Sequence, residues 1–322
     1  MRYVEVGGAK VSAIGLGCWQ FGSREWGYGK DYVENEAGAI VRRALDLGIT
    51  LIDTAEVYGF GTSERVVGQA LADRRSEAFV ATKVLPVMPL APIVVQRGRG
   101  SARRLQTQKI DLYQIHWPNP VVPIGPQMTG MRRLQQEGVV EHVGVSNFSL
   151  KQWQAAERSL GGPVLSNQVR YSLVARKPDR ELVPYAQQND RLVIAYSPLG
   201  QGLLSAKYDA TNRPTGAARA SNPLFLPENL ARAGELLEAL RSVAKTHDAT
   251  PAQVALAWLI RKPNVVAIPG ASSVKQLESN AAAADIELSD DDDALLTEAS
   301  DWFRPKQGIA SIPDLALARL RR

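Results

Sequence analysis

Side chains that can transfer protons follow three separate apolar runs in this chain. The runs lie within the segments Leu51–Tyr58, Ala78–Lys83 and Asp111–His116. Short apolar runs of this kind predict buried strands. If the strands are parallel, their carboxyl ends lie at one face, where barrel active sites are found. The sequence therefore predicts one shared site made of Asp53, Tyr58, Lys83 and His116.

These four residue types suit the protonation of a carbonyl oxygen. A phenol is a poor acid near neutral pH because its ordinary pKa is about 10. An ammonium against Tyr58 would stabilise the phenolate, and a carboxylate behind Lys83 would keep that lysine charged and oriented. A neutral imidazole from His116 would donate a hydrogen bond to the substrate oxygen. Side chains cannot supply hydride, so a nicotinamide is the expected partner.

Eight strand signals alternate with helical patterns along the chain. Amphipathic helices are predicted over Glu34–Leu47, Ser63–Leu71 and Leu90–Gln106. Alternation of this kind predicts an α/β fold, specifically a (β/α)8 TIM barrel, and 322 residues is a usual length for it. We expect a single domain over residues 1–322. The predicted strands are Ser12–Cys18, Thr50–Asp53, Ala78–Lys83, Asp111–His116, His142–Ser146, Val164–Val169, Leu192–Ser197 and Val265–Ile268.

Three segments lie outside the basic barrel plan. Tyr3–Val11 alternates around Gly7-Gly8, which predicts an N-terminal β-hairpin. Leu204–Glu228 is a long loop after strand seven, and we interpret it as a lid over a ligand. Ser289 precedes four aspartates and predicts a helix N-cap rather than a metal site.

An open doubly wound sheet is the structural alternative to the barrel. Gly15 and Gly17 begin the spacing of a dinucleotide-binding loop. The pattern is not completed at a helix start, because the loop beyond Gly22 is long and charged. We therefore favour the barrel.

Composition narrows the class of protein. Lys and Arg number 38 against 33 Asp and Glu, so we expect no nucleic-acid or membrane partner, although the balance suits an anionic cofactor. The single Cys18 excludes an internal disulfide, and the start lacks an apolar signal core, so we predict a cytoplasmic protein. His142 and His247 have no ligand partners at zinc spacing, so we expect no metal. No Gly-x-Ser-x-Gly points to a serine hydrolase.

The chain resembles the aldo-keto reductase family over nearly its whole length. The likeness rests on a series of motifs in the family's order: Gly15–Gly17, Asp53–Gly59, Thr82-Lys83, Asp111–His116, Gly144–Phe148, Asn167-Gln168, Tyr196–Leu199 and Ile268–Gly270. It implies a (β/α)8 barrel in which Tyr58 is the general acid/base. It also implies that Lys83 and Asp53 tune this tyrosine and that His116 orients the carbonyl.

The same resemblance assigns residues to a nicotinamide nucleotide. It implies that Ser146, Asn147 and Gln168 hold the carboxamide and that Tyr196 stacks on the nicotinamide ring. It places Ser197, Leu199 and Gln201 along the pyrophosphate. For the first two of these groups, turn chemistry at Ser146-Asn147 and barrel packing of Tyr196 are the simpler alternatives.

The adenine end departs from the family pattern. Members that prefer NADPH usually carry Lys or Arg after the last strand, whereas this chain reads Gly270-Ala-Ser-Ser-Val-Lys-Gln276. Serine hydroxyls and helix-start N–H groups can still bind phosphate. We expect NADPH as the cofactor, with NADH as the alternative and weak discrimination between them. The residues expected here are Ser272, Ser273, Lys275 and Asn280, with Arg213 or Arg219 adding charge.

Aromatic residues on loops and strand ends are expected to border the substrate. Trp19, Trp26, Tyr28 and Trp117 would offer flat apolar walls. The expected partner is a small-molecule carbonyl, an aldehyde or ketone with an aromatic or apolar body. The sequence identifies neither the particular substrate nor a protein partner.

Two other functions fit parts of the pattern. The family that the chain resembles includes regulatory subunits, such as potassium-channel beta subunits, that bind the cofactor in the same barrel and sense redox state. A redox-sensing subunit is therefore the main alternative to an enzyme. A lyase or isomerase would use Lys83 as a Schiff-base nucleophile, which the tyrosine and the nicotinamide-type residues argue against.

Overall fold

The computed structural model describes residues 1–23, 28–29, 34–214, 219 and 222–306. Its eight parallel strands follow one another in chain order around a sheet. Bridges Ile14↔Ala267 and Gly17↔Gly270 join the first strand to the last and close the barrel. The predicted (β/α)8 fold is thus confirmed. The strands are β3 (Leu16–Gly17), β4 (Leu51–Asp53), β5 (Phe79–Val84), β6 (Ile110–Ile115), β7 (Val140–Ser146), β8 (Ser166–Arg170), β9 (Leu192–Tyr196) and β10 (Val265–Ala267).

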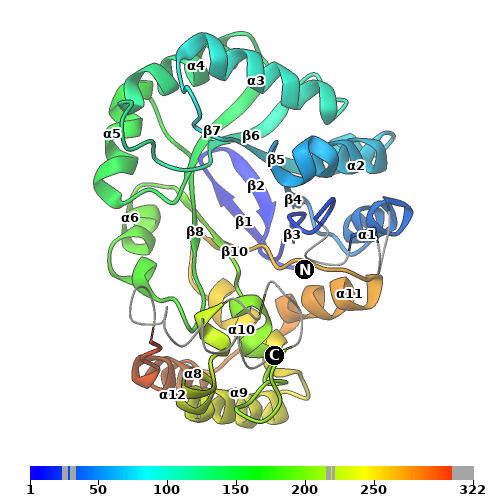
Figure 1. Cartoon of the computed structure of the whole chain (residues 1–322), viewed down its shortest axis with the longest axis vertical. Coiled ribbons are helices and arrows are strands. Elements are labelled where there is room, and N and C mark those ends of the chain that lie inside the picture. Colours follow the sequence, from blue (N-terminus) through cyan, green and yellow to red (C-terminus); the bar gives the residue numbers. More distant parts are fainter. Residues whose placement is uncertain (24–27, 30–33, 215–218, 220–221, 307–322) are drawn as a thin grey trace, which may run out of the picture.

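Helices surround the strands on the outside of the barrel (Figure 1). Each amphipathic helix buries one side, as α1 does with Ile40 and Val41. Within the described residues, no helix has the length and apolar character needed to cross a membrane. The helices are α1 (Glu34–Asp46), α2 (Thr62–Leu71), α3 (Ala91–Arg104), α4 (Ile124–Gln136), α5 (Leu150–Leu160), α6 (Leu182–Gln188), α8 (Pro227–Arg232), α9 (Gly234–Thr246), α10 (Pro251–Ile260), α11 (Val274–Ala282) and α12 (Asp290–Trp302).

An antiparallel hairpin precedes the barrel and closes one end of it. Its strands are β1 (Tyr3–Val6) and β2 (Ala9–Ser12), joined by Gly7 and Gly8 at φ 52° and 80°. Positive φ at both positions is what a two-residue hairpin turn requires, which confirms the predicted hairpin. The hairpin lies across the barrel in Figure 1, and its apolar side packs with inward-facing strand residues. The predicted active site lies at the other end of the barrel, which is formed by the carboxyl ends of the strands.

The first barrel strand is shorter than the predicted Ser12–Cys18. Ser12 pairs with Tyr3 and therefore belongs to the hairpin. Only Leu16–Gly17 pairs with β4, and the neighbouring Ile14 makes a single bridge to Ala267. A single run of residues thus contributes to two sheets, and the hydrophobic pattern does not show at which residue the hairpin strand ends and the barrel strand begins.

Two predictions at the far end of the chain have different outcomes. Ser289 caps α12: its hydroxyl accepts a hydrogen bond from Asp292 N, and the Asp292 carboxylate accepts one from Ser289 N. The N-cap prediction is confirmed. The long segment after β9 includes η5 (Gly200–Ser205) and η6 (Pro223–Phe225), while residues 215–218 and 220–221 lie outside the described part. A lid role for this segment stays a prediction.

Candidate active site

Lys83 lies at the centre of the predicted site and is fully buried. Its Nζ donates to Asp53 Oδ2 at 2.7 Å, to the Thr54 carbonyl oxygen at 2.8 Å and to Tyr58 Oη at 3.3 Å. Asp53 ends β4, Lys83 lies on β5, and Tyr58 begins the 3₁₀ turn η2 (Tyr58–Gly61). The three protons of the ammonium thus have three acceptors. The Thr54 carbonyl was not anticipated, since a main-chain acceptor leaves no signal in residue type.

The Lys83 ammonium and the Asp53 carboxylate each favour the charged form of the other. Burial disfavours the charged form of Lys83, but the Asp53 carboxylate and the Tyr58 phenol outweigh it and raise the lysine pKa. Burial also raises the pKa of Asp53, against the lowering effects of Lys83 and of a hydrogen bond from Gln168. Lys83 is therefore a charged donor at neutral pH.

The acidity of Tyr58 differs from the sequence-based expectation. The ammonium was expected to bring the phenol pKa below its ordinary value. In the structure, burial raises the pKa of Tyr58 by more than Lys83 lowers it. The rings of Trp19 and His116 lie 6.5 and 5.8 Å from the tyrosine ring and contribute to that burial. Lys83 thus limits the rise, and the proton stays on the phenol at neutral pH.

His116 follows β6 and turns its ring edge-on to Tyr58, at an interplanar angle of 77°. Burial, together with the Lys83 charge, lowers the pKa of His116 to about 3, so the imidazole is neutral at physiological pH. Its Nδ1 is buried and has no hydrogen-bond partner among the described residues. An unpaired acceptor costs less than an unpaired N–H donor. We therefore place the proton on Nε2.

The neutral state of His116 predicts a pH-dependent stability. Unfolded histidine titrates near about 6.5, whereas folded His116 titrates at about 3. Protonation then favours the unfolded chain, so this contribution is present above about pH 6.5 and is lost as the pH falls towards about 3. Urea unfolding over this range should show a shallower fall in stability for His116→Gln than for wild type. Parallel falls in the two proteins would contradict the assignment.

Four residues assigned by the resemblance to the nicotinamide side form one hydrogen-bonded group. Asn147 Nδ2 donates to Ser146 Oγ at 3.0 Å and to the His116 carbonyl at 3.2 Å. Tyr196 Oη donates to Asn147 Oδ1 at 2.9 Å, and Ser146 Oγ donates to the Gln168 carbonyl at 2.9 Å. Asn147 has a left-handed backbone, φ 64°, which asparagine tolerates better than most residues.

Gln168 joins this group to the proton-transfer residues. Its Nε2 donates to Asp53 Oδ1 at 2.7 Å. The carboxylate therefore accepts from Lys83 on one oxygen and from Gln168 on the other. The family resemblance assigned Gln168 to the nicotinamide carboxamide. The bond to Asp53 was not anticipated, because the two residues are 115 positions apart in the sequence.

The loop after β9 carries the residues predicted to lie along a pyrophosphate. Ser197 and Gln201 both have positive φ, 49° and 57°, and Leu199 lies between them directly before η5. Arg219 Nε donates to the Gln201 carbonyl at 2.9 Å, and Asn222 Nδ2 to Gln201 Oε1 at 2.8 Å. A guanidinium is thus held beside these residues.

The segment after β10 carries the residues predicted for the adenine end. Ser273 Oγ caps α11 by accepting from Gln276 N, while Ser272 N and Oγ donate to Gln276 Oε1. The N–H and hydroxyl groups of Ser272 are therefore bonded within the chain, at the helix start where serine hydroxyls and N–H groups were expected to bind a phosphate. Lys275 is exposed, and the buried Asn280 donates to the Gly270 carbonyl at 3.2 Å.

The predicted aromatic walls have different environments. Trp19 and Trp117 are 46% and 47% exposed, and Trp117 stacks on His116 at 6.4 Å. Tyr28 packs, partly buried, on the main core, whereas Trp26 lies outside the described residues. Sequence reasoning missed several exposed apolar side chains on the neighbouring loops, because isolated apolar residues in loops carry no periodic signal. They are Phe60, Val87, Met88, Leu90 and Val121.

Comparison with known proteins identifies the family and agrees with the barrel fold. The sequence model of the aldo/keto reductase family matches residues 13–301. The chain is 55% identical over 323 residues to the uncharacterized oxidoreductase Rv2298 of Mycobacterium tuberculosis, covering 100% of both, and 33% identical to the methylglyoxal reductase YeaE of Escherichia coli, covering 91% of this chain and 92% of that one. An aldo-keto reductase from Klebsiella pneumoniae solved with NADPH superposes with a TM-score of 0.76 at 32% identity, covering 95% and 96%.

The parallel barrel and the family match over residues 13–301 define the class of protein as an oxidoreductase. This chain belongs to the aldo/keto reductase family.

Proposed function

We propose that the protein reduces aldehydes or ketones to alcohols with NADPH. The observation that carries the proposal is the buried Lys83 ammonium, which joins Asp53 to the Tyr58 hydroxyl beside a neutral His116. In this scheme the nicotinamide supplies hydride to the carbonyl carbon. Tyr58 gives its proton to the carbonyl oxygen, and His116 Nε2–H orients that oxygen. Lys83 stabilises the phenolate that remains.

The residues around the cluster fit a nicotinamide nucleotide. Ser146, Asn147 and Gln168 present amide and hydroxyl groups beside the Tyr196 ring. Ser197 and Gln201 have positive φ in the loop after β9, and the Arg219 guanidinium beside Gln201 would attract an anionic pyrophosphate. The NADPH-bound Klebsiella protein supports this choice of cofactor.

We expect NADPH to bind more tightly than NADH, but by only about tenfold, or roughly 1.4 kcal/mol. The reason is that Lys275 is the sole cation in the Gly270–Gln276 segment, and the two serines are engaged in starting α11. Fluorescence titration of the protein with each nucleotide measures the ratio. Equal or tighter binding of NADH would contradict the NADPH preference, and binding of neither nucleotide would remove the proposed function.

The substrate we propose is a carbonyl compound with an apolar or aromatic body. The half-exposed rings of Trp19 and Trp117 flank Tyr58 and His116, and the loops after β4, β5 and β6 carry further exposed apolar residues. A panel of aldehydes and ketones monitored at the nicotinamide absorbance tests this proposal.

The two alternatives gain no support from the proteins compared above. YeaE is named as a reductase, which favours turnover over sensing. In a Schiff-base mechanism Lys83 would have to lose its proton, whereas its three acceptors favour the charged form. Borohydride trapping with a carbonyl substrate separates that chemistry from hydride transfer. We also propose a cytoplasmic location.

A further inference from the structure

An ion pair outside the proton-transfer cluster connects the loop after β4, which carries Tyr58, to the loop that follows Lys83 and the end of β5. Glu56 lies between Asp53 and Tyr58 in the chain, and its partner Arg97 lies on α3. The side chain of Glu56 is only 10% exposed and that of Arg97 is 26% exposed. No step of the reaction proposed above uses this pair.

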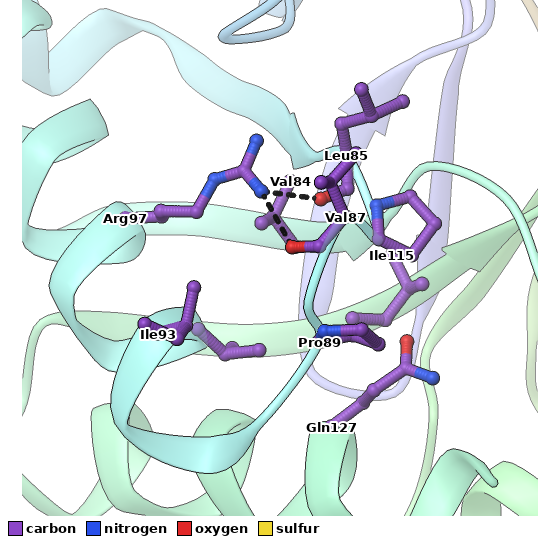
Figure 2. A pocket seen from close by; sticks show the side chains of 10 residues that line it. Val84, Leu85, Val87, Pro89, Ile93, Arg97, Ile115 and Gln127 are labelled. Atoms are coloured by element: carbon purple, nitrogen blue, oxygen red, sulfur yellow. Dashed lines mark hydrogen bonds between the residues drawn. The ribbon is translucent and has the colours of Figure 1, made fainter. Parts of the chain in front are cut away.

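Each group in the pair makes more than one bond. Arg97 Nε donates to Glu56 Oε2 at 3.0 Å, and Nη2 donates to Glu56 Oε1, so the contact is bidentate. Glu56 Oε1 also accepts from Leu85 N at 2.6 Å. Arg97 Nη1 donates to the carbonyls of Leu85 and Val87 at 2.7 and 3.3 Å, as Figure 2 shows.

These bonds continue the pairing of β4 with β5 past the ends of the strands. The main-chain bonds run from Thr54 N to the Ala81 carbonyl and from Glu56 N to the Lys83 carbonyl, at 2.8 and 3.3 Å. The next bond between the two segments is made by a side chain, because the Glu56 carboxylate accepts from Leu85 N. The pocket under this loop is lined mainly by apolar side chains, with Arg97 and Gln127 as the polar ones, and Arg97 is the side chain that bonds to the loop carbonyls (Figure 2).

The contact between Tyr58 and Lys83 depends on how the loop after β4 lies against β5 and the loop that follows it. At 3.3 Å it is the longest of the three Lys83 bonds; Tyr58 lies two residues after Glu56, and Lys83 lies two residues before Leu85. Neighbouring Phe60 and Gly59 have positive φ, 53° and 54°, so the chain around Tyr58 is held in an uncommon conformation.

We propose that Glu56 and Arg97 are positioning residues that set the distance between the Tyr58 hydroxyl and the Lys83 ammonium. This inference rests on the proposed function for its effect on turnover. Its effect on Tyr58 itself can be measured without turnover.

The main test compares Arg97→Met with wild type. A shift of about 1 Å in a reacting group can lower the rate about a hundredfold, so we expect kcat to fall 10- to 100-fold, while nucleotide affinity stays within about threefold. Loosening the lysine contact raises the phenol pKa, because Lys83 lowers it. Reduction needs the protonated phenol, so the alkaline limb of the kcat profile should move to higher pH. A fold that is merely less stable would lower kcat without moving that limb.

A second readout needs no substrate. Phenolate absorbance is titrated in wild type and in Arg97→Met, and each curve is corrected by subtracting that of the same protein carrying Tyr58→Phe. The difference isolates Tyr58, whose pKa should be higher in Arg97→Met. An unchanged Tyr58 titration overturns the inference, whether or not the proposed function holds.

Two further variants guard against loss of folding and serve as controls. Glu56→Gln keeps an acceptor for Leu85 N but removes the charge, so the same shift should appear in smaller size. The double variant of Glu56→Gln with Arg97→Met should be no worse than Arg97→Met alone, because the two residues act as one unit. Arg99→Met is the matched control: Arg99 lies on the same helix, is 48% exposed and pairs with Glu137, so kcat should stay within about twofold.

Discussion

Tyr58→Phe is expected to lower carbonyl reduction by about a hundredfold to ten-thousandfold while leaving the affinity for NADPH within about twofold. The substitution removes one oxygen and keeps the ring against Trp19 and His116. The Lys83 ammonium loses one of its three acceptors but keeps Asp53 and the Thr54 carbonyl. Proton supply is lost, whereas the residues proposed to hold the nicotinamide are untouched.

The measurement pairs steady-state reduction with nucleotide titration for the same protein. Tyr3→Phe is a suitable control, since it removes an exposed hydroxyl that donates to Gly48 on the hairpin side of the barrel. Wild-type turnover in Tyr58→Phe would show that another group protonates the substrate. Loss of nucleotide binding would instead show that Tyr58 contributes to the cofactor site.

Lys83→Met should reduce turnover to a similar extent, about a hundredfold or more, for a different reason. Burial raises the pKa of Tyr58, and the ammonium is the largest influence that opposes it. Without the ammonium the phenol releases its proton still less readily. The pKa of Tyr58 is therefore not expected to return to its ordinary solution value in Lys83→Met, because the phenol stays buried when the lysine is gone.

Lys83→Met also affects stability. The buried Asp53 carboxylate loses its cation, which costs about 3–5 kcal/mol in comparable pairs. Because the folded pKa of Lys83 is raised, its contribution is present below about pH 10.4, the unfolded value, and is lost as the pH rises through the folded value. Urea unfolding near neutral pH should therefore show the full loss.

A double variant separates the two effects of this substitution. Adding Asp53→Asn to Lys83→Met removes the uncompensated charge and should recover stability without recovering turnover. Lys109→Met, at an exposed pair with Glu141, is the control. Near-wild-type kcat in folded Lys83→Met would contradict the role given to the lysine.

Local pattern was enough to predict most of the barrel. Runs such as Leu192–Tyr196 are apolar because a parallel strand is covered on both sides, and the Gly7-Gly8 pair has a conformation that few other residues adopt. The predicted start of the first barrel strand was wrong, because Ser12 and Leu16 belong to one run in the sequence but to two different sheets in the structure. Pairing partners decide that division, and they are distant in sequence.

Residue types and their order along the chain are enough to specify which chemical groups stand at the ends of the strands. Asp53, Lys83 and His116 each end or follow an apolar run, and parallel strands bring their carboxyl ends to one face. Residue type and order therefore predicted the site and the family resemblance. The tertiary structure alone decided how these groups influence one another. Gln168 donates to Asp53 across 115 positions of the chain, and burial, rather than the lysine charge, determines the direction in which the pKa of Tyr58 shifts. Hydrogen-bond direction and burial depend on every neighbour in space, and only the closed barrel specifies those neighbours.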